Sequence, residues 1–166
     1  DRVVQPERHL HQPAAERRKR LLVADMEATI IANEMLEEIA DFIGERAKVA
    51  AITARAMNGE IDFVAALEER VALFKGLPES VLAAAGARIR VTPGAACLVA
   101  TMRANGAYAA LVSGGFGIYT RRIRAELGFD ADVANELEVA AGHLTGTVRA
   151  PILTRDSKLA APIRLA

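Results

Sequence analysis

Two apolar runs in this chain each end directly in a polar motif. The run at residues 21–24 is followed by Asp25 and Glu27, and the run at residues 108–112 is followed by Ser113 and two glycines. Short apolar runs of this kind are typical of strands that are buried on both faces of a parallel sheet. Because open parallel sheets bind ligands at the carboxyl ends of their strands, both motifs are expected to face one ligand. The chain therefore predicts an α/β fold with a site at this edge.

Four short amphipathic patterns lie between these two strands, in residues 32–90. Asp62 is placed to cap the third helix, and a Gly-Leu-Pro turn precedes the fourth. We therefore predict a helical cap over residues 32–90, inserted into an α/β core that is formed by residues 17–31 and 91–166. Residues 1–16 show no periodicity and predict a linker or leader.

The second half of the core contains three further patterns. Thr92, followed by a proline, predicts the start of a helix that ends near Asn105. Another helix is expected from residue 117 to residue 127, with Gly128 behind it. Residues 136–149 alternate around an Ala-Gly turn and predict a β-hairpin.

The bulk composition narrows the class of partner. The chain has 166 residues, and its 21 basic and 21 acidic residues leave no net field that favours nucleic acid or a membrane surface. No apolar stretch is long enough to span a bilayer. The single Cys97 excludes an internal disulfide and suits a reducing compartment. We expect a cytoplasmic protein without a nucleic-acid or membrane partner, and a homodimer is compatible with the sequence.

The polar residues at the strand ends fit the requirements of phosphoryl transfer, which are mainly positioning and charge stabilisation. Asp25 could attack phosphorus, and Glu27 could exchange protons with the leaving group and with water. Ser113 and the backbone N–H groups of Gly114 and Gly115 could hold phosphate oxygens, and Lys158 could offset charge repulsion. Each signal has a simpler reading, because strand-end acids cap helices, Ser-Gly-Gly forms turns and single lysines lie at surfaces.

The order and spacing of these motifs resemble those of the haloacid dehalogenase-like phosphohydrolases. Residues 25–29 are similar to the first motif of that family, residues 111–116 are similar to its second, and Lys158 is similar to its lysine. Cap segments at residues 52–59 and 70–73 resemble the phosphoserine phosphatase branch within the family. The resemblance covers nearly the whole chain after the leader.

This resemblance implies a Rossmann-like parallel-sheet core and hydrolysis of O-phospho-L-serine to L-serine and phosphate, the last step of serine biosynthesis. It implies an aspartyl-phosphate intermediate, Mg²⁺ as the cofactor and the small molecule phosphoserine as the binding partner. Asp25 would be the nucleophile and a Mg²⁺ ligand, and Glu27 would be the acid/base while its backbone carbonyl also binds the metal. Ser113, Gly114 and Lys158 would hold the phosphoryl group.

The resemblance also implies a substrate pocket in the cap. Glu34 would bind the substrate ammonium group and Arg70 its carboxylate, which the fork of a guanidinium matches. Met57 and Phe63 would help to close the cap over the substrate. The residues themselves leave alternatives open: Met57 and Phe63 fit plain core positions of amphipathic helices, and Glu34 could simply favour a helix N-terminus. Arg70 is harder to explain as a surface residue, because it shares the apolar face of its helix.

Two features depart from the family pattern. Glu27 stands where the second acid is usually Asp, and the extra methylene moves the carboxyl group by about a bond length, which can slow catalysis. No Asp or Glu follows Lys158, where the last motif of the family supplies further Mg²⁺ ligands. We therefore expect a fragment that lacks the C-terminal strands of the sheet and has little activity by itself.

Two alternative functions remain open. The first keeps the enzyme class and changes the substrate to another small phosphomonoester, or transfers the phosphoryl group to an acceptor such as homoserine. The second is a degenerate relative that binds phosphorylated metabolites or serves as a structural partner module. Glu27 and the absent last motif favour the second alternative, whereas Asp25, Ser113 and Lys158 argue against it.

Overall fold

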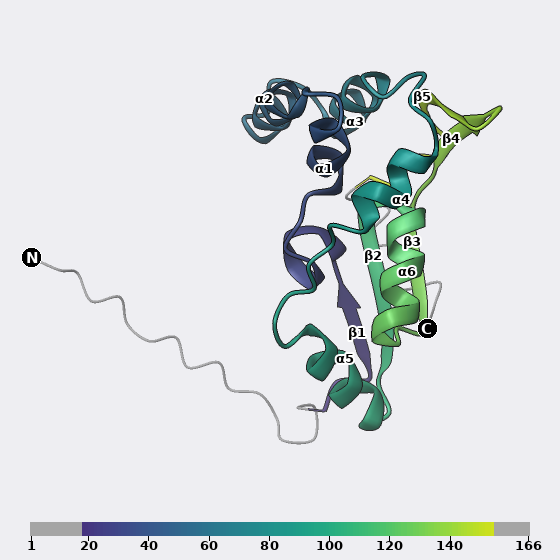
Figure 1. The fold of residues 1–166 in the computed structure, drawn as a ribbon. Helices are drawn as coiled ribbons and strands as arrows, with labels where there is room; N and C mark the ends of the chain where they lie inside the picture. Colours follow the sequence, from purple (N-terminus) through teal and green to yellow (C-terminus); the bar gives the residue numbers. More distant parts are fainter. Residues whose placement is uncertain (1–17, 155–166) are drawn as a thin grey trace, which may run out of the picture.

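A three-stranded parallel sheet forms the centre of the molecule (Figure 1). The computed structural model describes residues 18–154. The sheet order is β1 (Leu21–Ala24), β2 (Tyr108–Phe116) and β3 (Ala131–Asn135), with β2 in the middle. The predicted parallel α/β sheet is therefore confirmed, and the carboxyl ends of its strands face the helices at the top of Figure 1.

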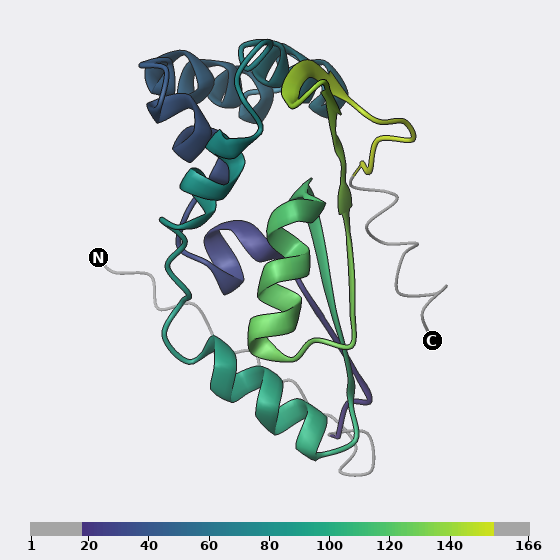
Figure 2. The same ribbon diagram turned by 45° about the vertical axis from the view of Figure 1, so that its right-hand side comes forward.

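Two helices, α5 (Ala95–Ala104) and α6 (Gly117–Leu127), pack beside each other and against β2 (Figures 1 and 2). The buried positions of α6, including Tyr119 and Ile123, recur at a helical spacing and face the apolar middle of β2. Gly128 ends α6 in the left-handed conformation with φ of 79°, as the sequence predicted.

The start of α5 differs from the prediction, which placed the N-cap at Thr92. The helix begins at Ala95, and Gly94 occupies the N-cap position with a left-handed φ of 88°. This backbone conformation interrupts the helical path before Ala95, and the N–H of Ala95 instead donates to the carbonyl of Thr92 at 3.0 Å in a turn. The Thr-Pro pair therefore precedes the helix without capping it.

Residues 32–90 form four helices, in agreement with the four amphipathic patterns predicted there. They are α1 (Met35–Asp41), α2 (Arg46–Met57), α3 (Phe63–Ala72) and α4 (Ser80–Gly86). Asp62 caps α3 as expected, because its side chain accepts the N–H of Ala65 at 2.9 Å.

The chain passes between the sheet and these helices twice, and the two passages are paired. Ile31 and Val91 form an isolated antiparallel bridge. Beside it, the N–H of Ala32 donates to the carbonyl of Arg90, and the N–H of Thr92 donates to that of Ile30, each at 2.9 Å. This connection places α1 beyond the carboxyl end of β1 (Figure 1).

The predicted hairpin is also present, as β4 (Leu137–Ala140) and β5 (His143–Val148). Ala141 and Gly142 both have positive φ, 49° and 74°, which is the requirement of a type I′ turn. The hairpin reaches the helices, because the backbone of Leu144 exchanges 2.8 Å hydrogen bonds with the segment that follows α3.

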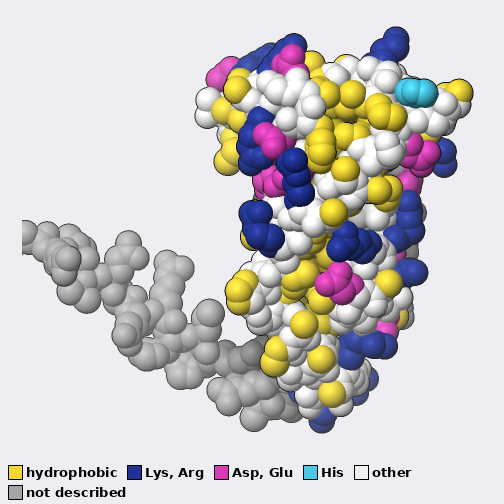
Figure 3. Space-filling view, in the orientation of Figure 1, with side chains coloured by type: hydrophobic (Ala, Val, Ile, Leu, Met, Phe, Trp, Pro, Cys, Tyr) yellow, Lys and Arg dark blue, Asp and Glu magenta, His cyan; other side chains and the backbone are white. Residues whose placement is uncertain are grey.

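Acidic and basic side chains lie interspersed on the face seen in Figure 3, in keeping with the balanced charge of the chain. Within residues 18–154, none of the helices has the length and apolar character needed to cross a membrane.

Candidate active site

A wide turn after β1 places the two strand-end acids. The turn spans Met26–Ile30 and is closed by a 2.9 Å hydrogen bond from the N–H of Ile31 to the carbonyl of Met26. Met26 is fully buried and anchors the turn, while its own N–H donates to the Asp25 carboxylate at 2.9 Å. Asp25 and Glu27 therefore flank a buried side chain at the end of the strand.

The Ser-Gly-Gly motif lies inside β2 and not after it, because β2 continues to Phe116. Val112 pairs with Val133 and Phe116 pairs with Asn135, so three residues of β2 oppose one residue of β3. Such an irregularity disrupts the ladder and bends the strand locally. The Asn135 side chain fills part of this gap by donating to the carbonyl of Gly114 at 2.8 Å.

A cavity of about 180 Å³ lies where the end of β1, the bulge of β2 and the helices α1 and α3 meet. It is lined by Asp25, Glu27, Glu34, Leu36, Phe63, Leu67, Arg70, Gly114 and Gly115. Two carboxylates from one strand end, a glycine-rich backbone and a cation from a helix therefore share one small space.

The cavity brings together seven of the residues singled out from the sequence: Asp25, Glu27, Glu34, Phe63, Arg70, Gly114 and Gly115. Ser113 lies behind the cavity wall, fully buried, and its hydroxyl oxygen accepts the N–H of Gly115 at 3.0 Å. Met57 does not line the cavity and is 83% exposed at the end of α2, which also excludes a plain core role. Lys158 lies outside the described residues.

Glu27 is packed between the sheet and the helices. Its Oε1 accepts the N–H of Met35, the first residue of α1, at 2.9 Å. Loss of hydration raises the pKa of Glu27 to about 7, and the neighbouring carboxylates of Glu34 and Asp25 add to the rise, against the opposing effects of the Met35 N–H and Arg70. A pKa of about 7 suits a group that donates and accepts a proton near neutral pH, which general acid/base catalysis requires.

Gly115 makes room for this carboxylate. A Cβ atom at position 115 would lie 2.7 Å from Oε2 of Glu27, which is closer than real Cβ atoms approach, and 3.0 Å from its Cδ, which is tighter than most Cβ contacts. The backbone of Gly115 does not adopt the left-handed conformation, so space and not φ excludes a side chain there.

Arg70 approaches the cavity from α3. Its Nε donates to the carbonyl of Ala66 at 2.9 Å, and its Nη1 donates to the hydroxyl of Thr53 at 3.2 Å. Burial lowers the pKa of Arg70, and the charges of Glu27 and Glu34 oppose that change. Among the described residues, Arg70 forms no ion pair within 4.0 Å.

Glu34 precedes α1 at its N-cap position but makes no capping hydrogen bond with its side chain. Loss of hydration and the charge of Glu37 raise the pKa of Glu34, while Arg70 opposes the rise. Its position before α1 is compatible with a favourable charge at the helix N-terminus, and its place in the cavity is compatible with ligand binding.

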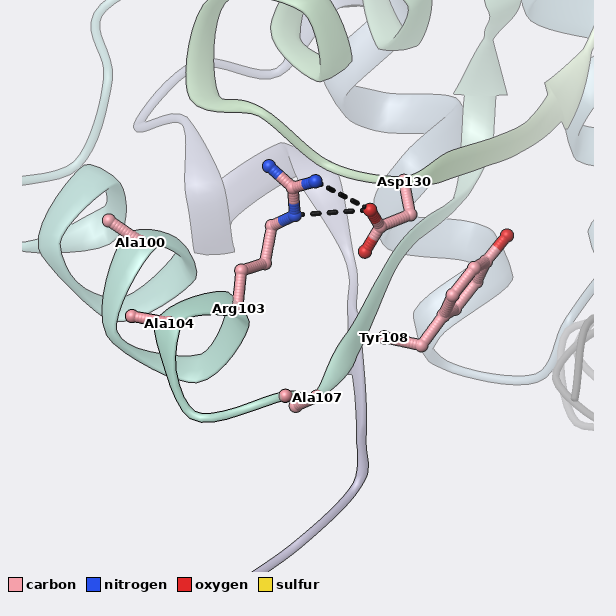
Figure 4. A pocket seen from close by; sticks show the side chains of 7 residues that line it. Ala100, Arg103, Ala104, Ala107, Tyr108 and Asp130 are labelled. Atoms are coloured by element: carbon pink, nitrogen blue, oxygen red, sulfur yellow. Dashed lines mark hydrogen bonds and ion pairs between the residues drawn. The ribbon is translucent and has the colours of Figure 1, made fainter.

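A larger hollow of about 650 Å³ lies at the opposite end of the sheet, near the start of β2 (Figure 4). Its charged residues already satisfy each other, since Arg103 forms a 2.8 Å ion pair with Asp130. Asp130 also accepts the N–H of Ala109 at 2.8 Å, and this bond, together with Arg103, lowers the pKa of the carboxyl group. These bonds connect β2, α5 and the segment before β3. We therefore interpret Arg103 and Asp130 as residues that stabilise the fold.

The structure adds residues that the sequence did not single out. Leu36 and Leu67 line the cavity, while Thr53 and Asn135 hold groups beside it. Leu67 shares a helix face with Arg70, so its spacing in the sequence carried a signal for its position. The other added residues make contacts between distant parts of the chain, and no local sequence pattern indicates such contacts.

The comparisons with known proteins agree with this arrangement. Residues 22–162 match the model of the haloacid dehalogenase-like hydrolases. The chain therefore belongs to the haloacid dehalogenase-like hydrolase family.

Curated relatives lie in one branch of this family. A phosphoserine phosphatase of Archaeoglobus fulgidus is 45% identical over 142 residues, which are 86% of this chain and 41% of the relative. That of Streptococcus thermophilus is 44% identical over 142 residues, 86% of this chain and 66% of the relative. The chain thus spans only part of the length of these relatives.

Two solved structures that resemble this chain are also phosphoserine phosphatases. A phospho-aspartyl intermediate analogue of phosphoserine phosphatase superimposes with a TM-score of 0.84 at 36% identity, over 90% of this chain and 72% of that chain. A substrate-bound phosphoserine phosphatase complex superimposes with the same TM-score and identity, over 91% of this chain and 72% of that one.

The raised pKa of Glu27 predicts a pH dependence of stability in the metal-free protein. Between about pH 4.5 and about pH 7 the folded state holds a proton that the unfolded state has lost, so the free energy of unfolding falls as pH rises through this window. Relative to Glu27→Gln, wild type should lose at most about 3 kcal/mol between about pH 5 and about pH 8. Chemical denaturation at several pH values measures this difference, and a difference independent of pH would contradict the assignment.

Because Gly115 and Glu27 are in contact, we expect the stability cost of a substitution at position 115 to depend on the residue at position 27. Gly115→Ala should cost about 1–3 kcal/mol through overpacking. The cost should fall by about 1 kcal/mol when Glu27→Asp is also present, because the shorter side chain withdraws the carboxylate. Gly86→Ala is the control, since its Cβ would meet Tyr119 at an ordinary 3.4 Å and no atom of Glu27 within 4 Å. An equal cost of Gly115→Ala in both backgrounds would show that space for Glu27 is not the reason for this glycine.

Proposed function

We propose that the whole protein that contains this chain is a phosphoserine phosphatase, which hydrolyses O-phospho-L-serine to L-serine and phosphate. The observation that carries the proposal is the cavity in which Asp25 and Glu27 share a wall with Gly114, while Glu34 and Arg70 enter from the helices. The activities named for the curated relatives support the same substrate.

In the proposed reaction, a carboxylate oxygen of Asp25 attacks phosphorus while the bond between phosphorus and the seryl oxygen breaks. Glu27 donates its proton to the departing oxygen and then accepts one from the water that cleaves the aspartyl-phosphate. A pKa of about 7 supports this double role, because both protonation states of Glu27 are populated near neutral pH.

The phosphoryl group would be held by the bulge of β2. Gly114 lines the cavity together with the acids, and the buried Ser113 precedes it and accepts the N–H of Gly115. Backbone N–H groups at such a bend suit phosphate oxygens. Lys158 completes this set in the proposal and lies outside the described residues.

The substrate amino acid would be bound by the helices. Arg70 forms no ion pair among the described residues and so offers its charge to a ligand carboxylate. Glu34 lies in the same cavity with the opposite charge and suits an ammonium group. Phe63 lines the cavity and is placed to exclude water, whereas the exposed Met57 would contact substrate only after a movement of α2.

We also propose Mg²⁺ as the cofactor. The Asp25 carboxylate and the Glu27 backbone carbonyl are hard oxygen donors of the kind Mg²⁺ prefers, and the ion commonly keeps waters and substrate phosphate as further ligands. Within residues 18–154, no group of three or more acidic, histidine or cysteine side chains is placed to hold a metal, so these two donors are only part of a shell. When bound, the ion would neutralise charge on the phosphoryl oxygens.

The division of the chain belongs to the proposal as well. The paired passages at residues 30–32 and 90–92 support a cap over residues 32–90 on a core of residues 17–31 and 91–166. The leader at residues 1–16, the cytoplasmic location and the homodimer stay predictions from the sequence.

The proposed substrate is tested with O-phospho-L-serine and O-phosphoethanolamine, which lacks the carboxylate. In the whole protein, Arg70→Ala should lower kcat/KM for phosphoserine by about a hundredfold, since a charged hydrogen-bonded pair is lost, and should change phosphoethanolamine hydrolysis little. Arg55→Ala is the control, because Arg55 lies on α2 but pairs with Glu69 at 2.9 Å.

Equal losses on both substrates would contradict the role of Arg70. An absence of phosphoserine hydrolysis by the wild-type protein would contradict the proposed function itself.

A further inference from the structure

The guanidinium group of Arg70 is held from two sides. On its own helix, the carbonyl of Ala66 accepts its Nε–H at 2.9 Å. From the neighbouring helix α2, the hydroxyl of Thr53 accepts its Nη1–H at 3.2 Å. A long side chain with many rotamers is thereby restrained to one direction before any ligand binds.

The direction of the hydrogen bond at Thr53 is set by its other partner. The single hydroxyl proton of Thr53 is donated to the carbonyl of Val49 at 3.0 Å, one turn earlier in α2. The hydroxyl oxygen is then free to act only as an acceptor toward Arg70. Val49 is fully buried, so the chain of bonds from Val49 through Thr53 to Arg70 begins at a fixed point in the core.

This restraint matters because Arg70 shares the cavity with competing anions. Glu27 and Glu34 line the same cavity and both interact electrostatically with Arg70. An unrestrained guanidinium would gain electrostatic energy by forming an ion pair with either carboxylate. In that ion pair, Arg70 would no longer be available to bind the carboxylate of a substrate. The acceptor at Thr53 is neutral, so it orients Arg70 without neutralising it.

We propose that Thr53 is a positioning residue that keeps Arg70 directed at an incoming carboxylate and so sets the preference of the site for amino-acid phosphate esters. This inference rests on the proposed function. It assigns a role in substrate binding to a residue that does not itself line the cavity. A restrained side chain loses less entropy on binding, so the effect belongs to substrate affinity and not to the chemical step.

The test compares Thr53→Val, which keeps the shape and removes the hydroxyl, with Thr53→Ser, which keeps the hydroxyl. Thr53→Val should raise KM for O-phospho-L-serine about tenfold, with kcat changed by less than about twofold, since one hydrogen bond to a charged group is lost. Its KM for O-phosphoethanolamine should stay at the wild-type value. Thr53→Ser should restore KM for phosphoserine to within about threefold of wild type.

The inference is overturned if Thr53→Val leaves both KM values unchanged, if it raises both equally, or if Thr53→Ser behaves like Thr53→Val, which would indicate packing alone.

A second measurement does not depend on turnover. Nitrogen NMR of the arginine side chains reports the rate of rotation about the Nε–Cζ bond of Arg70. Thr53→Val should speed this rotation at least about tenfold, because the Nη1 hydrogen bond that hinders it is gone. The signal of Arg55, which is paired with Glu69, should not change.

An unchanged rotation rate for Arg70 would overturn the inference. If the wild-type protein does not hydrolyse phosphoserine, the proposed function fails, and the NMR comparison alone decides whether Thr53 restrains Arg70.

Discussion

The carboxylate of Glu27 joins the sheet to the helices, and the site depends on that junction. It follows β1, accepts the first N–H of α1 from Met35, and lies against Gly115 in the bulge of β2. A shift of any of these elements would change the position and the pKa of the acid. The additional methylene of Glu27 is thus accommodated by a glycine on the neighbouring strand and by a backbone donor on the first helix.

The balance of charged groups in the cavity is the second constraint on the site. Three carboxylates and one guanidinium line a cavity of about 180 Å³, and a phosphate monoester brings further negative charge. Loss of hydration raises the pKa of Glu27 to about 7, which lowers the negative charge of the cavity near neutral pH. The remaining repulsion explains why a cation at Asp25 and a lysine belong to the proposed site.

The sequence predicted those features that local patterns control. Apolar runs with polar ends located β1 and β2, helical spacing located the four helices of residues 32–90, and an Ala-Gly turn located the hairpin. Features that depend on contacts between distant segments were not predictable, among them the bulge after Val112 and the pairing of Thr53 with Arg70. The exposure of Met57 was not predictable either. The apolar spacing along α2 does not show whether another element covers the end of that helix.

In the proposed reaction, Asp25 carries the phosphoryl group during turnover. Rapid acid quench of the whole protein with O-phospho-L-serine, followed by mass spectrometry of the peptide that contains Asp25, tests this step. The peptide should gain the mass of one phosphoryl group at Asp25, and Asp25→Asn should retain the fold and show neither the adduct nor turnover. Phosphoserine hydrolysis without the adduct, or with undiminished rate in Asp25→Asn, would contradict this step.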